Sequence, residues 1–516
     1  MRKSSLSSHV PALISGVALV FCFPYYKYGL LAFVALVPFL VSLFGRSPRG
    51  AFMAGFLMGL PYFYGTNYWV YHSISMYGGV NIIVSYLLVL LLSMYLSLYT
   101  GVFASLYVWQ IRRGSLPSML VAPVFWVMLE YLRSMALTGF PYSLIGYTQH
   151  AFLRFIQISD ITGVYGVSFL VVAVNGAIAD FFLTQKRVSE KPLFDLAPTI
   201  NGYLLIIVII VANLFYGSWR LNEYRPDGIP LRAAIVQPNI EQDVKWDSRY
   251  KDSVLNTLES MTVSAVNSGA EMVIWPETAL PFYLGLPRDA GYMDSLSHFI
   301  NSVSTPVLTG AVHVHKDSLE SGALRLSNSS VLFGANGHKM SQYDKVHLVP
   351  FGEYVPLKGV LGFLDKLVNG IGDYMPGSYT GTKPFRDRRF ATAICYEIAF
   401  PSLIRDSFRK EGDFLVTLTN DAWFGRTTGP FHHFSMSVFR AIENRKPVLR
   451  AANTGVSGFL DSTGRVLQNT PIFTRTVITE TVTTDNYRSF YSRFGDLFIY
   501  FCSIITILLI ADVRRR

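Results

Sequence analysis

The segment 391–397 reads Ala-Thr-Ala-Ile-Cys-Tyr-Glu and is followed by Pro401 and a stretch with helical spacing. A β-type apolar run that meets a helix predicts a sharp turn, with Cys395 at the carboxyl end of a strand. Such a turn presents a side chain beside backbone N–H groups, which suits a nucleophile and its developing oxyanion. Cys395 is the only cysteine between residues 222 and 496. A buried core cysteine, the usual fate of a free thiol, remains the alternative at this point.

Residues 222–496 around this turn alternate between short β-rich runs and amphipathic helical stretches, which is the pattern of an α/β domain. The predicted strands are Leu231–Val236, Glu271–Trp275, Pro306–Val312, Ser329–Phe333, Phe390–Cys395 and Phe414–Thr419. The predicted helices are Ser253–Asn267, Asp294–Val303, Pro401–Arg409 and His432–Asn444. Ala335-Asn336-Gly337 and Ser462-Thr463-Gly464 are typical of hairpin turns.

Composition separates this domain from the rest of the 516-residue chain. The whole chain is 51% hydrophobic and only 15% charged, whereas an average soluble protein carries roughly 25% charged residues. This composition excludes a disordered and a collagen-like protein and is hard to reconcile with a wholly soluble one. Three cysteines are too few for a disulfide framework. The net charge of +10 comes largely from Lys and Arg between apolar runs, so it predicts membrane topology rather than nucleic-acid binding.

Eight apolar segments approach the roughly 20 residues that a membrane-spanning helix needs. They are Val10–Phe23, Leu30–Phe44, Ala51–Tyr71, Ile82–Trp109, Met119–Ala136, Val164–Leu183, Tyr203–Tyr216 and Leu497–Ala511. Residues 1–221 are thus predicted to hold seven helices, and residues 497–516 the eighth with a basic tail.

Basic residues alternate between the two sides of this arrangement, as the positive-inside rule requires. The inner segments contain Arg2, Lys3, Arg46, Arg49, Arg112, Arg113, Lys186, Arg187, Lys191, Arg514, Arg515 and Arg516, and the short outer loops contain Lys27 and Arg154. Both termini are therefore predicted to be cytoplasmic and residues 222–496 to be exported, which in a bacterium means the periplasm.

Two further side chains in the exported segment could act with a thiol. Glu277 ends the run Trp275-Pro276-Glu277, where it could serve as a general base. Lys345 could lower the pKa of a thiol or stabilise an oxyanion. Taken singly, each is more often a surface or structural charge, and so are Glu353 and Glu397.

Other candidates have weaker patterns. His432 and His433 are adjacent rather than four residues apart, and no Cys/His pair has ligand spacing, so no metal site is predicted. Glu130 and Arg133 lie three residues apart on a predicted membrane helix. Charges at that depth are usually paired or functional, which leaves a structural ion pair and contact with a lipid headgroup as alternatives.

Taken together, these segments resemble the nitrilase (carbon–nitrogen hydrolase) superfamily and, within it, the membrane-bound apolipoprotein N-acyltransferase family. The order Glu277, Lys345, Cys395 is similar to that of the superfamily's triad. The resemblance extends to the segments Trp275-Pro276-Glu277, Tyr343-Asp344-Lys345, Leu348–Glu353, Cys395-Tyr396-Glu397, Thr419–Gly425 and Arg450–Gly455.

The resemblance implies an αββα sandwich carried by about eight transmembrane helices. It implies that Cys395 is the nucleophile, Glu277 the general base and Lys345 the oxyanion stabiliser. Support is implied from Glu353, Tyr396 and Glu397. Substrate contacts are expected at Trp246, Trp423, Glu130 and Arg133. No metal or cofactor is implied.

The function that the resemblance implies is acyl transfer. A phospholipid, with phosphatidylethanolamine the expected donor, would acylate Cys395, and the thioester would pass its chain to the α-amine of a diacylglyceryl-cysteine apolipoprotein. We expect a monomer in the bacterial inner membrane. A membrane-anchored amidase or nitrilase is one alternative. A transporter with a ligand-binding domain is another, although polar residues in the helices, such as Asn175 and Asp180, are sparse for a translocation path.

Overall fold

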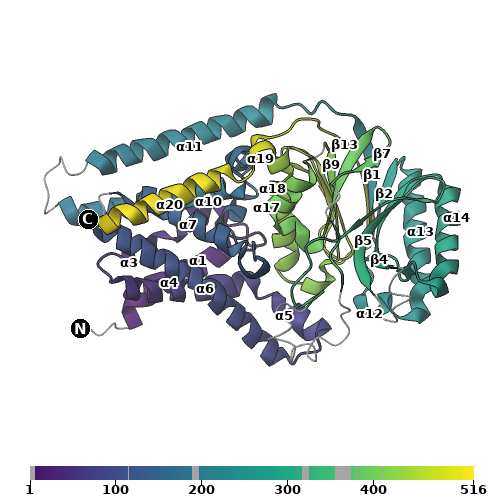
Figure 1. Ribbon diagram of the computed structural model, residues 1–516, viewed down its shortest axis with the longest axis horizontal. Coiled ribbons are helices and arrows are strands. Elements are labelled where there is room, and N and C mark those ends of the chain that lie inside the picture. Colours follow the sequence, from purple (N-terminus) through teal and green to yellow (C-terminus); the bar gives the residue numbers. More distant parts are fainter. Residues whose placement is uncertain are drawn as a thin grey trace. The chain divides into compact units, whose positions relative to one another are not determined.

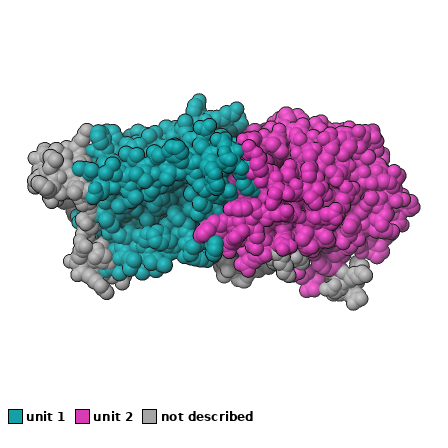
Figure 2. Space-filling view, turned by 90° about the horizontal axis from the view of Figure 1, so that it is seen from above, with its two compact units in different colours: residues 1–71, 81–224, 494–516 teal, residues 72–80, 225–493 magenta. Residues whose placement is uncertain are grey.

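The computed structural model describes residues 6–113, 116–188, 197–315, 325–354, 374–378, 381–409 and 411–515. Four basic residues used in the topology prediction, Arg2, Lys3, Lys191 and Arg516, lie outside these ranges. The chain forms two compact units (Figure 2). The first comprises residues 1–71, 81–224 and 494–516, and the second comprises residues 72–80 and 225–493.

The first unit is helical (Figure 1). Its main helices are α1 (Val10–Cys22), α2 (Ala32–Ala35), α3 (Val37–Ser42), α4 (Pro48–Asn67), α6 (Ile82–Arg113), α7 (Ser118–Arg133), α10 (Val164–Val188), α11 (Ala197–Glu223) and α20 (Leu497–Arg515). Every predicted apolar segment coincides with helix. Among the described residues, three helical stretches are long and apolar enough to cross a membrane, namely Ile82–Arg112, Val164–Leu183 and Ile200–Glu223. Eight spans are therefore not confirmed.

Two of the polar residues in these helices form hydrogen bonds with the backbone of other helices. Asn175 of α10 accepts from the Leu36 N–H and donates to the Ala32 carbonyl, at the break between α2 and α3. Asp180 accepts from the first two N–H groups of α7, those of Ser118 and Met119, and so caps that helix. Both contacts are structural, and they weaken the transporter alternative.

The second unit contains two β-sheets. Within the described residues the first sheet has seven strands, in the order β13-β1-β2-β4-β5-β6 with β3 paired to β4. These are β1 (Pro230–Gln237), β2 (Met272–Ile274), β3 (Tyr283–Leu284), β4 (Val307–Val314), β5 (Leu326–Phe333), β6 (Lys339–Asp344) and β13 (Thr476–Thr483). The second sheet has six, in the order β12-β11-β10-β9-β8-β7. These are β7 (Lys383–Phe385), β8 (Arg388–Ile394), β9 (Phe414–Thr419), β10 (Val448–Ala452), β11 (Gly458–Leu460) and β12 (Val466–Asn469).

The sheets pack face to face and helices cover their outer faces (Figure 1). Alternate side chains of both sheets, such as Ile235 and Ile274 from the first and Phe414 and Val416 from the second, form a shared apolar core. Outside the first sheet, a second core involves α13 (Lys251–Asn267) and α14 (Ala290–Val303). The helices α17 (Pro401–Ser407) and α18 (Gly429–Asn444) lie beside the second sheet. This agrees with the α/β pattern of the sequence and is the αββα arrangement that the family resemblance implies for the C-terminal half.

Parallel pairing places several strand ends at one edge. β2 pairs in parallel with β1 and β4, while β9 pairs in parallel with β8 and β10. Strands buried on both faces require continuous apolar sequence, and β9 is buried throughout. The predicted hairpin turns are also confirmed, because Gly337 and Gly464 adopt positive φ between β5 and β6 and between β11 and β12.

Candidate active site

Glu277, Lys345 and Cys395 each follow a strand. Glu277 comes three residues after β2, while Lys345 and Cys395 come directly after β6 and β8. All three side chains are buried, with exposed fractions of 5%, 1% and 7%. Their charges also act on one another, since both Glu277 and Lys345 affect the pKa of the Cys395 thiol.

Lys345 is held between two carboxylates. Its Nζ lies 2.9 Å from both carboxylate oxygens of Glu353 and 4.0 Å from Oε1 of Glu277. Burial alone would lower the pKa of Lys345, but the two carboxylates outweigh it and raise the pKa above its usual range. The side chain therefore remains an ammonium ion at neutral pH and cannot act as a base.

Glu277 is fixed by two amide donors. Nδ2 of Asn328, on β5, donates to its Oε1 at 2.7 Å, and the Asn420 N–H donates to its Oε2 at 2.8 Å. Nδ2 of Asn328 also donates to Glu353, so one side chain holds both carboxylates. Burial raises the pKa of Glu277 more than the nearby Lys345 lowers it. A carboxylate with a raised pKa is a stronger base than an exposed one.

Cys395 occupies a strained turn. Its φ of +50° lies in the left-handed region, which costs an L-residue roughly 1–2 kcal/mol, and the short helix Cys395–Ala399 begins at this residue. Burial raises the pKa of the thiol, Glu277 raises it further and Lys345 opposes both. The resting thiol is therefore protonated, and a nearby base must take the proton before sulfur can attack.

Glu397 joins the cysteine turn to the lysine loop. Its fully buried carboxylate accepts hydrogen bonds from the Ile394 N–H on one side of the site. On the other side it accepts from the Tyr343 hydroxyl and from the Val346 and His347 N–H groups, at 2.7–3.0 Å. Glu397 thus links the segment around Lys345 to the turn at Cys395.

Replacing Glu397 with glutamine should destabilise the domain, because an NH₂ group would then face backbone N–H donors. Leaving such buried groups unpaired costs about 2 kcal/mol, which corresponds to a melting midpoint lower by roughly 4–8 °C. Thermal unfolding of the purified protein measures this, with exposed Glu411→Gln as the matched control. Equal midpoints for the two variants would contradict the role of Glu397 as a link.

The three predicted aromatic residues lie in separate surroundings. Tyr396 packs against His347 and Phe400, with ring centroids 5.7 and 5.0 Å away. Trp246 is half-buried and lies 5.3 Å from the Tyr283 ring. Trp423 contacts residues 72–80, which belong to the second unit, through the Tyr77 ring at 4.5 Å and through the Ser73 hydroxyl, which donates to its carbonyl.

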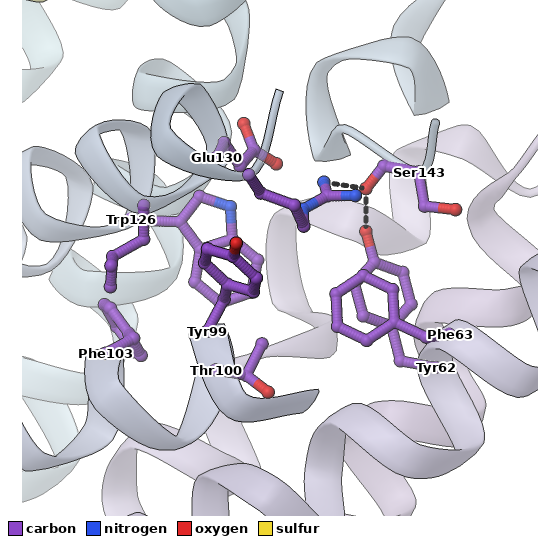
Figure 3. A pocket seen from close by; sticks show the side chains of 10 residues that line it. Tyr62, Phe63, Tyr99, Thr100, Phe103, Trp126, Glu130 and Ser143 are labelled. Atoms are coloured by element: carbon purple, nitrogen blue, oxygen red, sulfur yellow. Dashed lines mark hydrogen bonds between the residues drawn. The ribbon is translucent and has the colours of Figure 1, made fainter. Parts of the chain in front are cut away.

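Glu130 and Arg133 lie in the helical unit and contact backbone atoms. The buried Arg133 guanidinium donates to the carbonyls of Phe140, Tyr142 and Ser143, and Glu130 accepts from the Ile145 N–H. A small cavity of about 20 Å³, room for about one water molecule, lies between them and aromatic side chains (Figure 3). These contacts favour the structural alternative, since they hold the loop 140–145, and the lipid contact stays a prediction.

Sequence reasoning assigned no role to Asn328, because an asparagine inside a strand has no characteristic spacing. It also missed that His313 and His315, two residues apart, come together with Asp344. Their ligand atoms lie within 4.8 Å of one another, the one such group among the described residues.

The two-sheet fold of the second unit places the chain in the class of carbon–nitrogen hydrolases. A family model for carbon–nitrogen hydrolase matches residues 232–491, and a model for the apolipoprotein N-acyltransferase N-terminal domain matches residues 15–177. Because relatives across the full length carry the same name, the chain belongs to the apolipoprotein N-acyltransferase family. The N-terminal match favours this family over a membrane-anchored amidase.

Two of these relatives show how far the similarity extends along the chain. Apolipoprotein N-acyltransferase of Geobacter metallireducens is 37% identical over 98% of this chain and 95% of its own length. That of Haemophilus influenzae is 32% identical over 99% and 96%. Among solved structures, Saccharomyces cerevisiae Nit3, a member of branch 10 of the nitrilase superfamily, aligns with 49% of this chain and 90% of its own, with 17% identity and a TM-score of 0.39.

Proposed function

We propose that this protein transfers an acyl chain from a membrane phospholipid to the α-amine of the N-terminal diacylglyceryl-cysteine of apolipoproteins, through a thioester on Cys395. The observation that carries the proposal is the buried Lys345 ammonium, held by Glu353 and Glu277 beside a cysteine in a left-handed turn. Family membership supplies the substrate class. Glu277, Lys345 and Cys395 are the proposed catalytic residues.

In the first half-reaction, Glu277 takes the proton from the Cys395 thiol as sulfur attacks the ester carbonyl of the phospholipid. The S–C bond forms, and negative charge develops on the carbonyl oxygen, where Lys345 stabilises it. The C–O ester bond then breaks. Glu277 returns the proton to the departing alkoxide, which leaves as a lysophospholipid.

In the second half-reaction, the neutral α-amine of the apolipoprotein attacks the thioester carbonyl. The N–C bond forms and the C–S bond breaks. Glu277 takes the proton from nitrogen and returns it to sulfur, which restores the resting thiol. Splitting the transfer into two steps through a covalent intermediate replaces one difficult reaction by two easier ones and gives ping-pong kinetics. Glu353 and Glu397 act by holding Lys345 and the cysteine turn.

Intact mass spectrometry of the purified protein tests this proposal. After incubation with phosphatidylethanolamine we expect an acyl-sized mass increase that hydroxylamine removes, as it does for thioesters. A synthetic diacylglyceryl peptide with a free α-amine should discharge the adduct faster than water does, whereas the same peptide with an acetylated amine should not. Absence of an adduct, with bound lipid and an intact thiol both demonstrated, would contradict the mechanism.

We also infer that residues 1–221 and 497–516 form an eight-helix base in the inner membrane, with both termini cytoplasmic and residues 222–496 in the periplasm. Support comes from the alternation of basic residues and from the helices found at every predicted segment. The full chain with a C-terminal green fluorescent protein should fluoresce, and protease added to spheroplasts should cut within 222–496. A fusion that does not fluoresce, together with residues 222–496 resisting the protease, would contradict this topology.

A further inference from the structure

A group of fully buried polar residues lies directly behind the cysteine turn. It consists of Asp421, which follows β9, His433 on α18 and Arg450 on β10. Nη2 of Arg450 lies 2.9 Å from Oδ2 of Asp421 and 2.9 Å from Nδ1 of His433. Nδ1 of His433 is also 3.0 Å from Oδ1 of Asp421. On its other side, Nε2 of His433 lies 3.0 Å from the backbone carbonyl oxygen of Cys395.

The hydrogen-bond partner of Nε2 determines which nitrogen of the His433 ring carries a hydrogen. A carbonyl oxygen only accepts, so Nε2 must carry a hydrogen and donate to Cys395. Burial and the neighbouring Arg450 lower the pKa of His433, so the ring is neutral at neutral pH and Nδ1 accepts from Arg450. Were the ring protonated, Nδ1 would donate to Asp421 and Nε2 would still donate to Cys395. The contact with the cysteine carbonyl therefore exists in both protonation states.

Asp421 keeps the imidazole in place. Burial alone would raise the pKa of Asp421, but Arg450, together with His433 and Thr419, lowers it to about 2. The carboxylate is therefore charged throughout the working range and remains paired. The preceding residue, Asn420, donates its N–H to the catalytic base Glu277. One short segment thus positions the base through its backbone and the cysteine turn through His433.

The anchored carbonyl belongs to the residue with the strained backbone. Cys395 must keep a φ of +50° to present its side chain at the end of β8, and without an anchor its peptide groups could rotate toward more favourable angles. We propose that His433 is a positioning residue for the reaction: by donating from Nε2 to the Cys395 carbonyl, it holds the nucleophile in the left-handed turn. This rests on the proposed role of Cys395.

The test compares two amide substitutions that differ in length alone. In His433→Gln the amide nitrogen can reach the former position of Nε2, whereas in His433→Asn it can reach only that of Nδ1. We expect His433→Asn to form the acyl-enzyme about 100-fold more slowly at saturating phosphatidylethanolamine, because small misplacements of a reacting group have effects of that size. His433→Gln should remain within about 10-fold of wild type. The lipid concentration at half-saturation should change little in either variant.

The controls distinguish a loss of positioning by His433 from a loss of folding and from a failure of the proposed reaction. His432→Gln, the same substitution one residue earlier on α18, should acylate within about threefold of wild type. Equal rates for His433→Gln and His433→Asn at matched melting midpoints would overturn the inference, as would an equal loss in His432→Gln. If wild type itself forms no acyl adduct with phosphatidylethanolamine, the proposed function fails, whereas a wild-type adduct that His433→Asn forms equally fast refutes only the role of His433.

Discussion

Replacing Cys395 with alanine should abolish both the acyl adduct and acyl transfer, lowering the transfer rate by at least about 10⁴-fold. Losses of this size follow when a covalent catalyst loses its nucleophile, because the remaining groups have no atom to carry the acyl chain. The substitution removes one buried sulfur atom and leaves the contacts of Glu277, Lys345 and Glu353 in place. The protein should therefore still fold and bind phospholipid.

The chain supplies its own controls for this experiment. Its other cysteines, Cys22 on α1 and Cys502 on α20, are also buried. Cys22→Ala and Cys502→Ala should acquire the same adduct as wild type, and the double variant retains Cys395 as the single thiol of the chain. Intact mass after incubation with phosphatidylethanolamine measures wild type and all four variants. A hydroxylamine-sensitive adduct on Cys395→Ala would place the nucleophile elsewhere.

The central strands could be predicted because burial on both faces leaves a clear sequence record. β8 and β9 are short apolar runs that end abruptly at Cys395 and Asn420, so the pattern that predicts the strands also predicts which residues stand at their ends. β6 has no such record. Its sequence Lys-Met-Ser-Gln-Tyr-Asp is polar and mostly half-exposed, and the preceding Asn336-Gly337 turn was the available sign of a hairpin.

The pairing of strands that are far apart in the sequence cannot be predicted from any local pattern. β13 mixes threonine and one glutamate with three apolar residues, which is compatible with a half-buried strand. Nothing in it specifies the partner β1, about 240 residues earlier. Asn328 and His433 were missed as site residues for the same reason. Asn328 looks like an ordinary strand residue, and only the pairing of β5 with its neighbours brings it between Glu277 and Glu353.

For the membrane segments, apolar composition does not predict where a helix is broken. The run Leu30–Phe44 is apolar except for Ser42, but Pro38 cannot donate the N–H that would continue the helix, so the helix breaks between α2 and α3. Asn175 hydrogen-bonds to the backbone at this break. α4 contains Pro61 together with glycines that allow close packing against α6, and this lowers its mean hydropathy. Apolar composition therefore predicted where helices occur more reliably than whether each one is a simple straight span.

Replacing Glu277 with glutamine should slow acyl-enzyme formation by about 10³-fold at pH 7, since glutamine keeps the shape of the side chain but cannot accept the thiol proton. In wild type, the acylation rate should fall as the pH drops through the pKa of Glu277, because only the carboxylate form is a base. Burial raises that pKa, so the acid limb should lie above the value for an exposed glutamate.

The pH profile of Glu277→Gln then distinguishes loss of a base from simple misplacement. Without a base, sulfur reacts only as the thiolate, and burial keeps the pKa of Cys395 high. The rate should therefore rise about tenfold per pH unit across the accessible range, without the plateau that wild type reaches above the pKa of Glu277. Stopped incubations with phosphatidylethanolamine, without amine acceptor so that its own titration does not enter, measure this by intact mass. A flat or bell-shaped profile in the variant would show that another group accepts the proton, and Glu277 would then be a structural ligand of Lys345.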